Sequence, residues 1–200
     1  MSSRDHAPAS AAVSDLFLRR WSPHAFADKP LPPGAITAVL DAARWSASSH
    51  NEQPWRYLVV TRDHPEEFNR LAACLSDNNK RWAPRAPALL LAAYRRTHSD
   101  DGQPNRHALH DLGQADSALA LQAAALGLAV RPMGAFDKDA ARAAFAIPEE
   151  YQPWLVLAFG WPGTPDQLPE DLRALETAPR QRRPLGEIAF DGKWGKPLGG

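Results

Sequence analysis

The segment Pro87–Tyr94 limits the fold most strongly, because it consists only of apolar and aromatic residues. Such a run is typical of a strand that is buried on both faces of a sheet. Further along, His107–Leu126 follows the spacing of a helix and is apolar almost all round from Ala115, which predicts a long buried helix. Its many alanines would let another helix approach closely, within the chain or from a second subunit. Asp116 lies inside this helix and needs a partner, such as a donor at a subunit interface.

Shorter patterns of the same two kinds surround these elements. Alternating and β-branched runs predict further strands, and apolar residues at helical spacing predict further helices. The strands are expected at 55–61, 128–135 and 153–160, and the helices at 10–20, 35–46, 63–75 and 137–145. We assign no regular element to the acidic, proline-rich segment 161–179. Helices and strands therefore mix in the manner of the α+β class.

The length of 200 residues suits a single domain with appendages. We expect a flexible leader at 1–10, one domain at 11–184 and a C-terminal extension at 185–200. The extension is too polar and too rich in glycine to form a hydrophobic core of its own.

Composition argues against several classes of function. The formal net charge is zero, which gives no reason to expect binding to nucleic acid or to an anionic membrane. No run of 18 apolar residues occurs, so no membrane-spanning helix is expected. The single cysteine, Cys74, excludes an intrachain disulfide and a multi-cysteine metal site, and it favours a reducing compartment such as the cytoplasm. His107 and His110 have no nearby glutamate or cysteine, so we expect a solvated helix start there and no metal.

Two arginine clusters are candidates for holding a phosphate. The sequence contains no P-loop, G-x-G-x-x-G, H-E-x-x-H or G-x-S-x-G motif. It does contain Arg19-Arg20 and, far away along the chain, Arg180, Arg182 and Arg183. The planar guanidinium group binds two phosphate oxygens at once, and two such clusters can close on one anion. The alternative is that each cluster is a solvated surface run.

The ten residues 46–55 carry more hydrogen-bonding groups than a plain turn needs. The short polar side chains and the carboxamide in this loop are Ser46, Ser48, Ser49, Asn51 and Gln53. Such groups reach a ligand or the backbone without long flexible stems. The loop suits a planar heterocycle whose edge alternates donors and acceptors, such as a flavin pyrimidine. A polar connection with a helix cap is the alternative.

Four segments carry a resemblance to a known family. They are Arg-Trp-Ser-Pro-His-Ala-Phe at 20–26, the loop at 46–55, the stretch 127–137 that contains Pro-Met-Gly-Ala, and Arg-Gln-Arg-Arg-Pro-Leu at 180–185. The same segments occur in the same order in the FMN-dependent nitroreductase family. The chain resembles this family over residues 14–190, with the first two segments the most specific.

The resemblance implies an α+β, nitroreductase-like fold with a central, mostly antiparallel sheet flanked by helices. It also implies a homodimer, with one FMN in each of two clefts between subunits and the C-terminal tail lying over the partner. The implied activity is ping-pong hydride transfer from NAD(P)H through FMN to a small-molecule acceptor such as a nitroaromatic or a quinone. The alternatives are other flavin chemistry, such as dehalogenation, flavin cleavage or dehydrogenation, and a flavin-binding sequestration or sensor protein with little turnover.

The family motifs imply cofactor contacts for individual residues. These residues are Arg19, Arg20, Trp21, Ser22, His24, Ser48, Ser49, Asn51, Gln53, Asn79, Trp82, Pro132, Met133, Gly134, Ala135, Arg180, Arg182 and Arg183. Arg20 and Ser22 would contact the phosphate and the pyrimidine side of FMN. Arg180 and Arg182 would complete the phosphate site, with Arg183 as a competitor for that role.

The remaining roles concern the flavin ring. The loop 46–55 would come from the other subunit, and a backbone N–H at Gly134 would face N5, where hydride arrives and leaves. Relatives often carry lysine near N1 and O2, where negative charge accumulates on reduction, but the matching positions here are His24 and Trp82. His24 and Gly134 are therefore the residues expected to take part in catalysis, His24 by stabilising the reduced flavin. A glutamate often found in the N5 turn is replaced here by Gly134.

Overall fold

The computed structural model describes residues 13–198, and the expected flexible leader at 1–10 lies outside them. In chain order, the elements are α1 (Asp15–Arg19), α2 (Ala35–Arg44), β1 (Trp55–Thr61), α3 (Pro65–Ala73), α4 (Asp77–Lys80), β2 (Ala88–Arg95), α5 (Ala108–Ala125), β3 (Ala129–Met133), α6 (Lys138–Ala144), β4 (Tyr151–Gly160) and α7 (Glu170–Thr177). Short 3₁₀ turns lie at Ser49–Asn51, Ala83–Arg85, Pro165–Gln167 and Leu185–Glu187.

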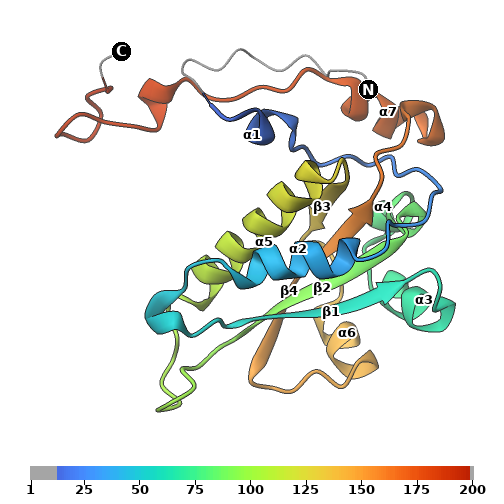
Figure 1. Ribbon diagram of the computed structural model, residues 1–200, viewed down its shortest axis with the longest axis horizontal. Coiled ribbons are helices and arrows are strands. Elements are labelled where there is room, and N and C mark those ends of the chain that lie inside the picture. The colour runs from blue at the N-terminus through green and yellow to red at the C-terminus, as the bar shows by residue number, and fades with distance from the viewer. Residues whose placement is uncertain (1–12, 199–200) are drawn as a thin grey trace.

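The four strands form one sheet in the order β1-β2-β4-β3. Each neighbouring pair is antiparallel, with Leu58 opposite Leu91 and Leu90 opposite Leu157 in the centre of the sheet. All four predicted strands are present, and helices flank the sheet (Figure 1). The predicted α+β class with an antiparallel sheet is therefore confirmed.

The strand β2 is buried on both faces, as its apolar sequence predicts. Leu89 and Leu91 belong to a core that includes residues of α3, α6 and α7. Leu90, which points to the opposite face, packs in a second core with residues of α2 and α5. Figure 1 shows α2 and α5 lying together across that face. Because side chains alternate along a strand, one apolar run can serve both cores.

The partner of Asp116 lies within the same chain. The hydroxyl of Tyr57, on β1, donates to Oδ1 of Asp116 at 2.8 Å. Oδ2 of Asp116 is buried and has no hydrogen-bond partner among residues 13–198. One donor to Asp116 is therefore on β1 of the same chain, and a donor from a second subunit stays a prediction.

Two helices occur where the sequence predicts none. α7 begins after Pro169, and proline is favoured at the start of a helix because the first N–H groups have no partner within the helix. The prolines of 161–179 thus mark a helix start and not an absence of helix. α4 is a single turn capped by Ser76, whose hydroxyl accepts from the Asn79 N–H at 3.5 Å. α6 is capped by Asp137, whose Oδ1 accepts from the Ala140 N–H at 2.9 Å.

The segment 185–198 extends away from the sheet and its helices (Figure 1). It contains one isolated bridge between Phe190 and Pro197, and none of its side chains is buried. Trp194 is 88% exposed, so this segment forms no core of its own, as its composition predicts. None of the helices that the structure describes is long and apolar enough to span a membrane.

Candidate functional site

Arg20 and Ser22 lie just beyond α1, where the backbone becomes extended and the helix ends. Nη1 of Arg20 donates to the hydroxyl of Ser22 at 3.3 Å. Burial, and beyond it the positive charge of Arg182, lowers the pKa of Arg20. Within residues 13–198, neither group forms an ion pair with a carboxylate. Two like charges without a counter-ion form a favourable place for an anion.

Arg180 links the two ends of the chain at this point. Its Nη1 donates to the carbonyl of Leu18 at 2.5 Å, and its Nη2 donates to the carbonyl of Arg20 at 3.1 Å. These bonds tie the segment after α7 to the end of α1. The structure therefore brings the two arginine clusters together, which a shared anion site requires.

Arg19 and Arg183 lie in more exposed surroundings. Arg19 pairs with Asp15 at 2.6 Å, and Arg183 pairs with Glu187 at 3.3 Å. Exposed pairs of this kind contribute little to stability and do not prevent a role in binding. Their contact with a phosphate stays a prediction, and the geometry favours Arg20 with Arg182. Trp21, next to Arg20, is half-buried.

The imidazole ring of His24 is buried and faces Glu176. Its Nδ1 lies 3.1 Å from Oε2 of Glu176, and only 10% of the side chain is exposed. The backbone N–H groups of His24 and Ala25 donate to the same carboxylate at 2.9 and 3.2 Å. Glu176 comes from α7 and is itself 2% exposed. One carboxylate therefore holds two successive backbone groups and the ring of His24.

Trp82 lies in the core and not at the surface. It is 1% exposed, its ring stacks on Phe26 with the centroids 6.3 Å apart, and His24 meets it edge-on at 5.2 Å. The prediction that its loop lies near the cofactor site is compatible with these neighbours. The indole itself packs behind the segment that carries Ser22 and His24.

Arg131, on β3, completes this cluster. Its guanidinium carbon lies 5.2 Å from the centroid of the Trp82 ring, and its Nη1 donates to the carbonyl of Ser22 at 2.6 Å. Burial lowers the pKa of Arg131, and the carboxylate of Glu176 opposes that change. The sequence alone did not lead us to predict a role for Arg131 or for Glu176. The signal for Arg131 was its position directly before Pro-Met, whereas Glu176 sat in a segment with no predicted element.

Asn79 lies beside the turn that follows β3. Its Nδ2 donates to the carbonyl of Ala135 at 3.1 Å, and the Ser76 N–H donates to the same oxygen at 3.2 Å. A hollow of about 370 Å³ opens here, lined by Ala73, Cys74, Leu75, Ser76, Lys80, Ala135, Phe136 and Asp137. The structure thus brings together two residues that the sequence predicts to contact the cofactor.

The turn is open at Gly134. A Cβ atom there would lie 3.7 Å from Cδ2 of Leu155, which is an ordinary van der Waals distance, and the glycine does not have a positive φ. Neither space nor backbone conformation requires glycine at this position. Pro132 and Ala135 are exposed as well, whereas Met133 is 3% exposed and points into the core.

The polar loop before β1 is ordered by its own hydrogen bonds. The hydroxyl of Ser48 accepts from the Gln53 N–H at 3.0 Å, and the Ser49 N–H donates to Oδ2 of Asp111 at 3.1 Å. Nε2 of Gln53 donates to the carbonyl of Asn51 at 3.1 Å. Asn51 and Gln53 have φ values of 56° and 46°, which are uncommon for residues other than glycine. Contacts within the chain therefore define the shape of the loop.

The loop lies far from the other predicted site residues. In Figure 1 it forms the turn between α2 and β1 at one end of the molecule, whereas α4 and α7 lie at the opposite end. A single chain consequently does not bring Ser48, Ser49 or Asn51 to the turn after β3.

A cluster of two carboxylates and an imidazole joins this loop to the turn after β2. Ligand atoms of Glu52, His98 and Asp100 lie within 4.8 Å of one another. Both oxygens of Glu52 already accept hydrogen bonds from Ser99, one from its N–H and one from its hydroxyl, each at 3.0 Å. The clustering is thus explained by a clamp between two loops, and we assign it no metal.

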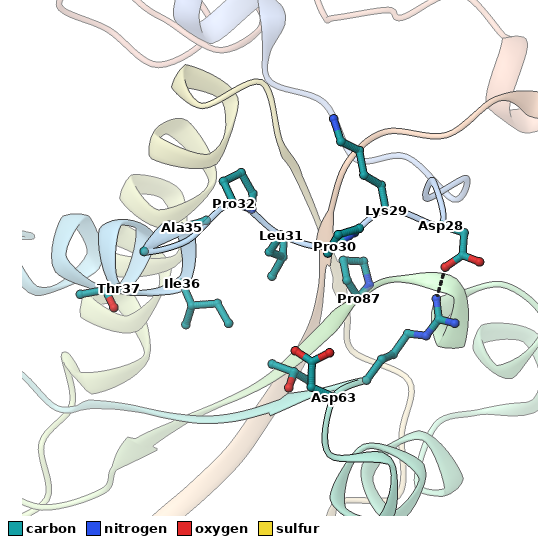
Figure 2. A pocket seen from close by; sticks show the side chains of 13 residues that line it. Asp28, Lys29, Pro30, Leu31, Pro32, Ala35, Ile36, Thr37, Asp63 and Pro87 are labelled. Atoms are coloured by element: carbon teal, nitrogen blue, oxygen red, sulfur yellow. Dashed lines mark hydrogen bonds and ion pairs between the residues drawn. The ribbon is translucent and has the colours of Figure 1, made fainter.

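A hollow of about 500 Å³ lies elsewhere, beside the start of α2 (Figure 2). It is lined by Asp28, Lys29, Pro30, Leu31, Pro32, Gly34, Ala35, Ile36, Thr37, Thr61, Arg62, Asp63 and Pro87. An ion pair of 2.7 Å between Arg62 and Asp28 borders it. None of the residues predicted to bind the cofactor lines this hollow, so its size does not make it the functional site.

Comparison with known proteins gives a consistent result. Residues 18–161 match the model of the nitroreductase family. A crystal structure of an oxidoreductase containing FMN is 34% identical over 98% of this chain and 99% of that chain, with a TM-score of 0.90. An uncharacterized 15.4 kDa protein of Mycolicibacterium smegmatis is 35% identical over 133 residues, which are 66% of this chain and 88% of that protein. A protein of Stenotrophomonas maltophilia named "Putative NADH dehydrogenase/NAD(P)H nitroreductase" is 32% identical over 150 residues, 66% of this chain and 76% of that protein. The expected nitroreductase-like fold is confirmed.

Proposed function

This chain belongs to the nitroreductase family, and on that premise we propose that it is an FMN-dependent oxidoreductase acting on nitroaromatics, quinones or similar acceptors. FMN would supply the redox chemistry, accepting hydride from NAD(P)H and passing it on in a ping-pong sequence. The protein's own residues bind the phosphate, orient the ring and set the charge around it.

The pair Arg20 and Arg182 is the observation that carries this proposal. The bonds of Arg180 to the carbonyls of Leu18 and Arg20 bring the segment that carries Arg182 to Arg20, and neither Arg20 nor Arg182 pairs with a carboxylate among residues 13–198. A phosphate dianion would remove their repulsion and accept charge-assisted hydrogen bonds. Arg180 supports the arrangement by holding the two chain segments together through the carbonyls of Leu18 and Arg20. Since the sequence has no glycine-rich phosphate loop, the arginines take its place.

The turn after β3 and the segment at Ser22 would border the ring. Exposed backbone at Gly134 and Ala135 offers N–H groups to a flavin edge, as proposed for N5. Asn79 holds this turn through the Ala135 carbonyl, so its contribution includes the shape of the backbone there.

We also propose a homodimer in which the polar loop of a second copy completes each site. The loop lies too far from α4 and α7 to serve the site of its own chain (Figure 1). Apolar side chains stand exposed near it, Trp45 at the end of α2 at 78% and Leu109 at the start of α5 at 38%, and homodimer interfaces bury such surface. The extension 185–200 would lie over the second copy, and this contact would bury the side chain of Trp194, which is exposed in the single chain. Cys74, a buried free thiol, fits the proposed cytoplasmic location.

Flavin content and anaerobic reduction test this proposal. The purified protein should be yellow, should lose its flavin absorption on mixing with NADH or NADPH without oxygen, and should recover it when a nitroaromatic or a quinone is added. Bound flavin that neither nucleotide reduces would favour a sequestration or sensor protein instead. A colourless monomer that takes up no added FMN would overturn the proposal.

A further inference from the structure

The side chains at the two positions where relatives often carry lysine near the flavin pyrimidine, His24 and Trp82, pack inside the protein here. Trp82 is uncharged and 1% exposed. His24 turns its ring toward Glu176, and 10% of its side chain is exposed. Both side chains are therefore packed in the interior of the protein, so we looked for a positive charge at this end of the site on another residue.

Arg131 provides a positive charge at this place from a different element. Its guanidinium group lies over the Trp82 ring at 5.2 Å and donates to the Ser22 carbonyl at 2.6 Å. It thus stands between the segment at Ser22 and the start of the turn at Pro132, the two parts of one chain proposed to border the ring. An arginine remains protonated even where burial lowers its pKa, so this charge persists across the physiological pH range.

Glu176 both positions this cluster and moderates its charge. It holds the backbone N–H groups of His24 and Ala25, which fixes the segment whose Ser22 carbonyl Arg131 contacts. The same carboxylate interacts electrostatically with Arg131. Removing the guanidinium and removing the carboxylate should therefore change the local potential in opposite directions.

We propose that Arg131 is the cation that favours reduced over oxidised flavin in this protein, and that Glu176 is the residue that positions Arg131 and offsets part of its charge. The proposal rests on the proposed binding of FMN and deepens it. Negative charge gathers on the pyrimidine edge of the flavin upon reduction, so a nearby positive charge binds the reduced form more tightly than the oxidised form.

The test is the midpoint potential of bound FMN, which reports the ratio of the affinities for reduced and oxidised flavin. Arg131→Gln should lower this ratio about tenfold, which is about 30 mV for a two-electron couple. Arg131→Lys keeps the charge and should stay within about threefold of the unmodified protein. Glu176→Gln should raise the ratio, a change of sign that a merely structural role for these residues would not produce.

Oxidised FMN binding, followed by quenching of flavin fluorescence, separates this proposal from the proposed function. Arg131→Gln should bind oxidised FMN within about threefold of the unmodified protein, because Arg20 and Arg182 still hold the phosphate. Failure of the unmodified protein to bind FMN would overturn both the function and this inference. Binding of FMN with an unchanged ratio in Arg131→Gln would overturn the inference alone.

Two further variants make the assignment specific. Arg70→Gln removes an exposed guanidinium paired with Glu66 on α3, and it should leave the ratio unchanged. His24→Gln preserves a donor for Glu176, and a tenfold drop in this variant would assign the cation to His24 and overturn the role of Arg131. If Arg131→Gln fails to fold, Glu176→Gln carries the test, and a ratio that falls or stays constant there contradicts the proposal.

Discussion

The two ends of the molecule that hold the predicted site residues are built in different ways. At the end near α7, buried charges organise the site, with Glu176 and Arg131 holding the segment that follows α1. At the other end, the loop before β1 keeps its shape through short polar side chains and positive φ angles, with little burial. The hydrogen bonds that hold the first end join distant parts of the chain, whereas most of those at the second end are local. The difference is consistent with our proposal that the loop serves the site of a second copy.

The largest difference between the two ends should appear in stability. Glu176→Ala should lower the free energy of unfolding by about 3–5 kcal/mol, because buried N–H groups of His24 and Ala25 lose their acceptor and Arg131 loses a counter-charge. Glu52→Ala, at the loop end, should cost about 1 kcal/mol, because the donors of Ser99 can turn to water. Urea unfolding measures both values. Equal losses would contradict the contrast between a buried and a polar end.

Replacing a third carboxyl group, that of Asp116 on α5, should raise the free energy of unfolding, whereas replacing Glu176 should lower it. Burial raises its pKa to about 6, since it has the Tyr57 hydroxyl as its one hydrogen-bond donor among the described residues. A raised pKa means that folding favours the protonated form, so this stabilisation is present below the unfolded pKa of about 4 and is lost as the pH rises through 6. Asp116→Asn should therefore stabilise the protein at pH 8, by up to about 3 kcal/mol.

Thermal or urea unfolding of Asp116→Asn at pH 4 and pH 8 checks this prediction. The gain should shrink toward zero at the lower pH, where the carboxyl group of the unmodified protein is already protonated. Tyr57→Phe is the matched control, because it removes the donor and should destabilise at both pH values. A gain from Asp116→Asn that does not depend on pH would contradict the assigned cause.

Removal of either Arg20 or Arg182 should weaken FMN binding. Arg20→Ala and Arg182→Ala each delete charge-assisted contacts of about 1.5–3 kcal/mol, which corresponds to about 10- to 150-fold in Kd. Arg44→Ala, whose guanidinium pairs with Asp41 on α2, should leave Kd unchanged. Fluorescence titration with FMN gives the three constants. Full retention of flavin by both site variants would rule out this pair as the phosphate site.

Mixing two variants that each lack flavin binding tests whether each flavin site combines the α7 end of one chain with the polar loop of the other. One chain carries Arg20→Ala, and the other carries Ser49→Ala with Asn51→Gly, which suits the positive φ there. Random exchange into heterodimers should restore flavin binding at about a quarter of the sites, because half of the dimers would contain one intact site. No recovery after verified subunit exchange would place both ends in one chain's site.

The smallest effect is expected at the turn after β3. Gly134→Ala should change the free energy of unfolding by less than about 0.5 kcal/mol, since the added Cβ meets Leu155 at an ordinary distance. The same change should leave FMN binding intact, because the turn contributes backbone groups. A loss above about 1 kcal/mol in urea unfolding would show that glycine is needed for the turn.

The elements themselves were readable from local patterns. The strand Ala88–Arg95 follows from its apolar run, and the cap at Asp137 follows from a polar residue directly before a helical pattern. Even α7, which we missed, carries a local signal in Pro169, because proline both interrupts and begins helices. The arginine pair was also accessible, although the sequence could not say which members would be left without partners.

The sequence by itself determined which stretches form strands and helices and which residue types could bind a phosphate, because those properties depend on neighbours a few positions apart. Only the tertiary structure decided how the charges are paired. His24 faces Glu176 across 152 positions of sequence, and Arg131 reaches Ser22 across 109. Such partners are set by the order of the strands and the packing of α7. The spacing of residues along the sequence does not predict these contacts. The role predicted for His24 stays a prediction, and our proposal of Arg131 for that role depends on contacts that exist only in three dimensions.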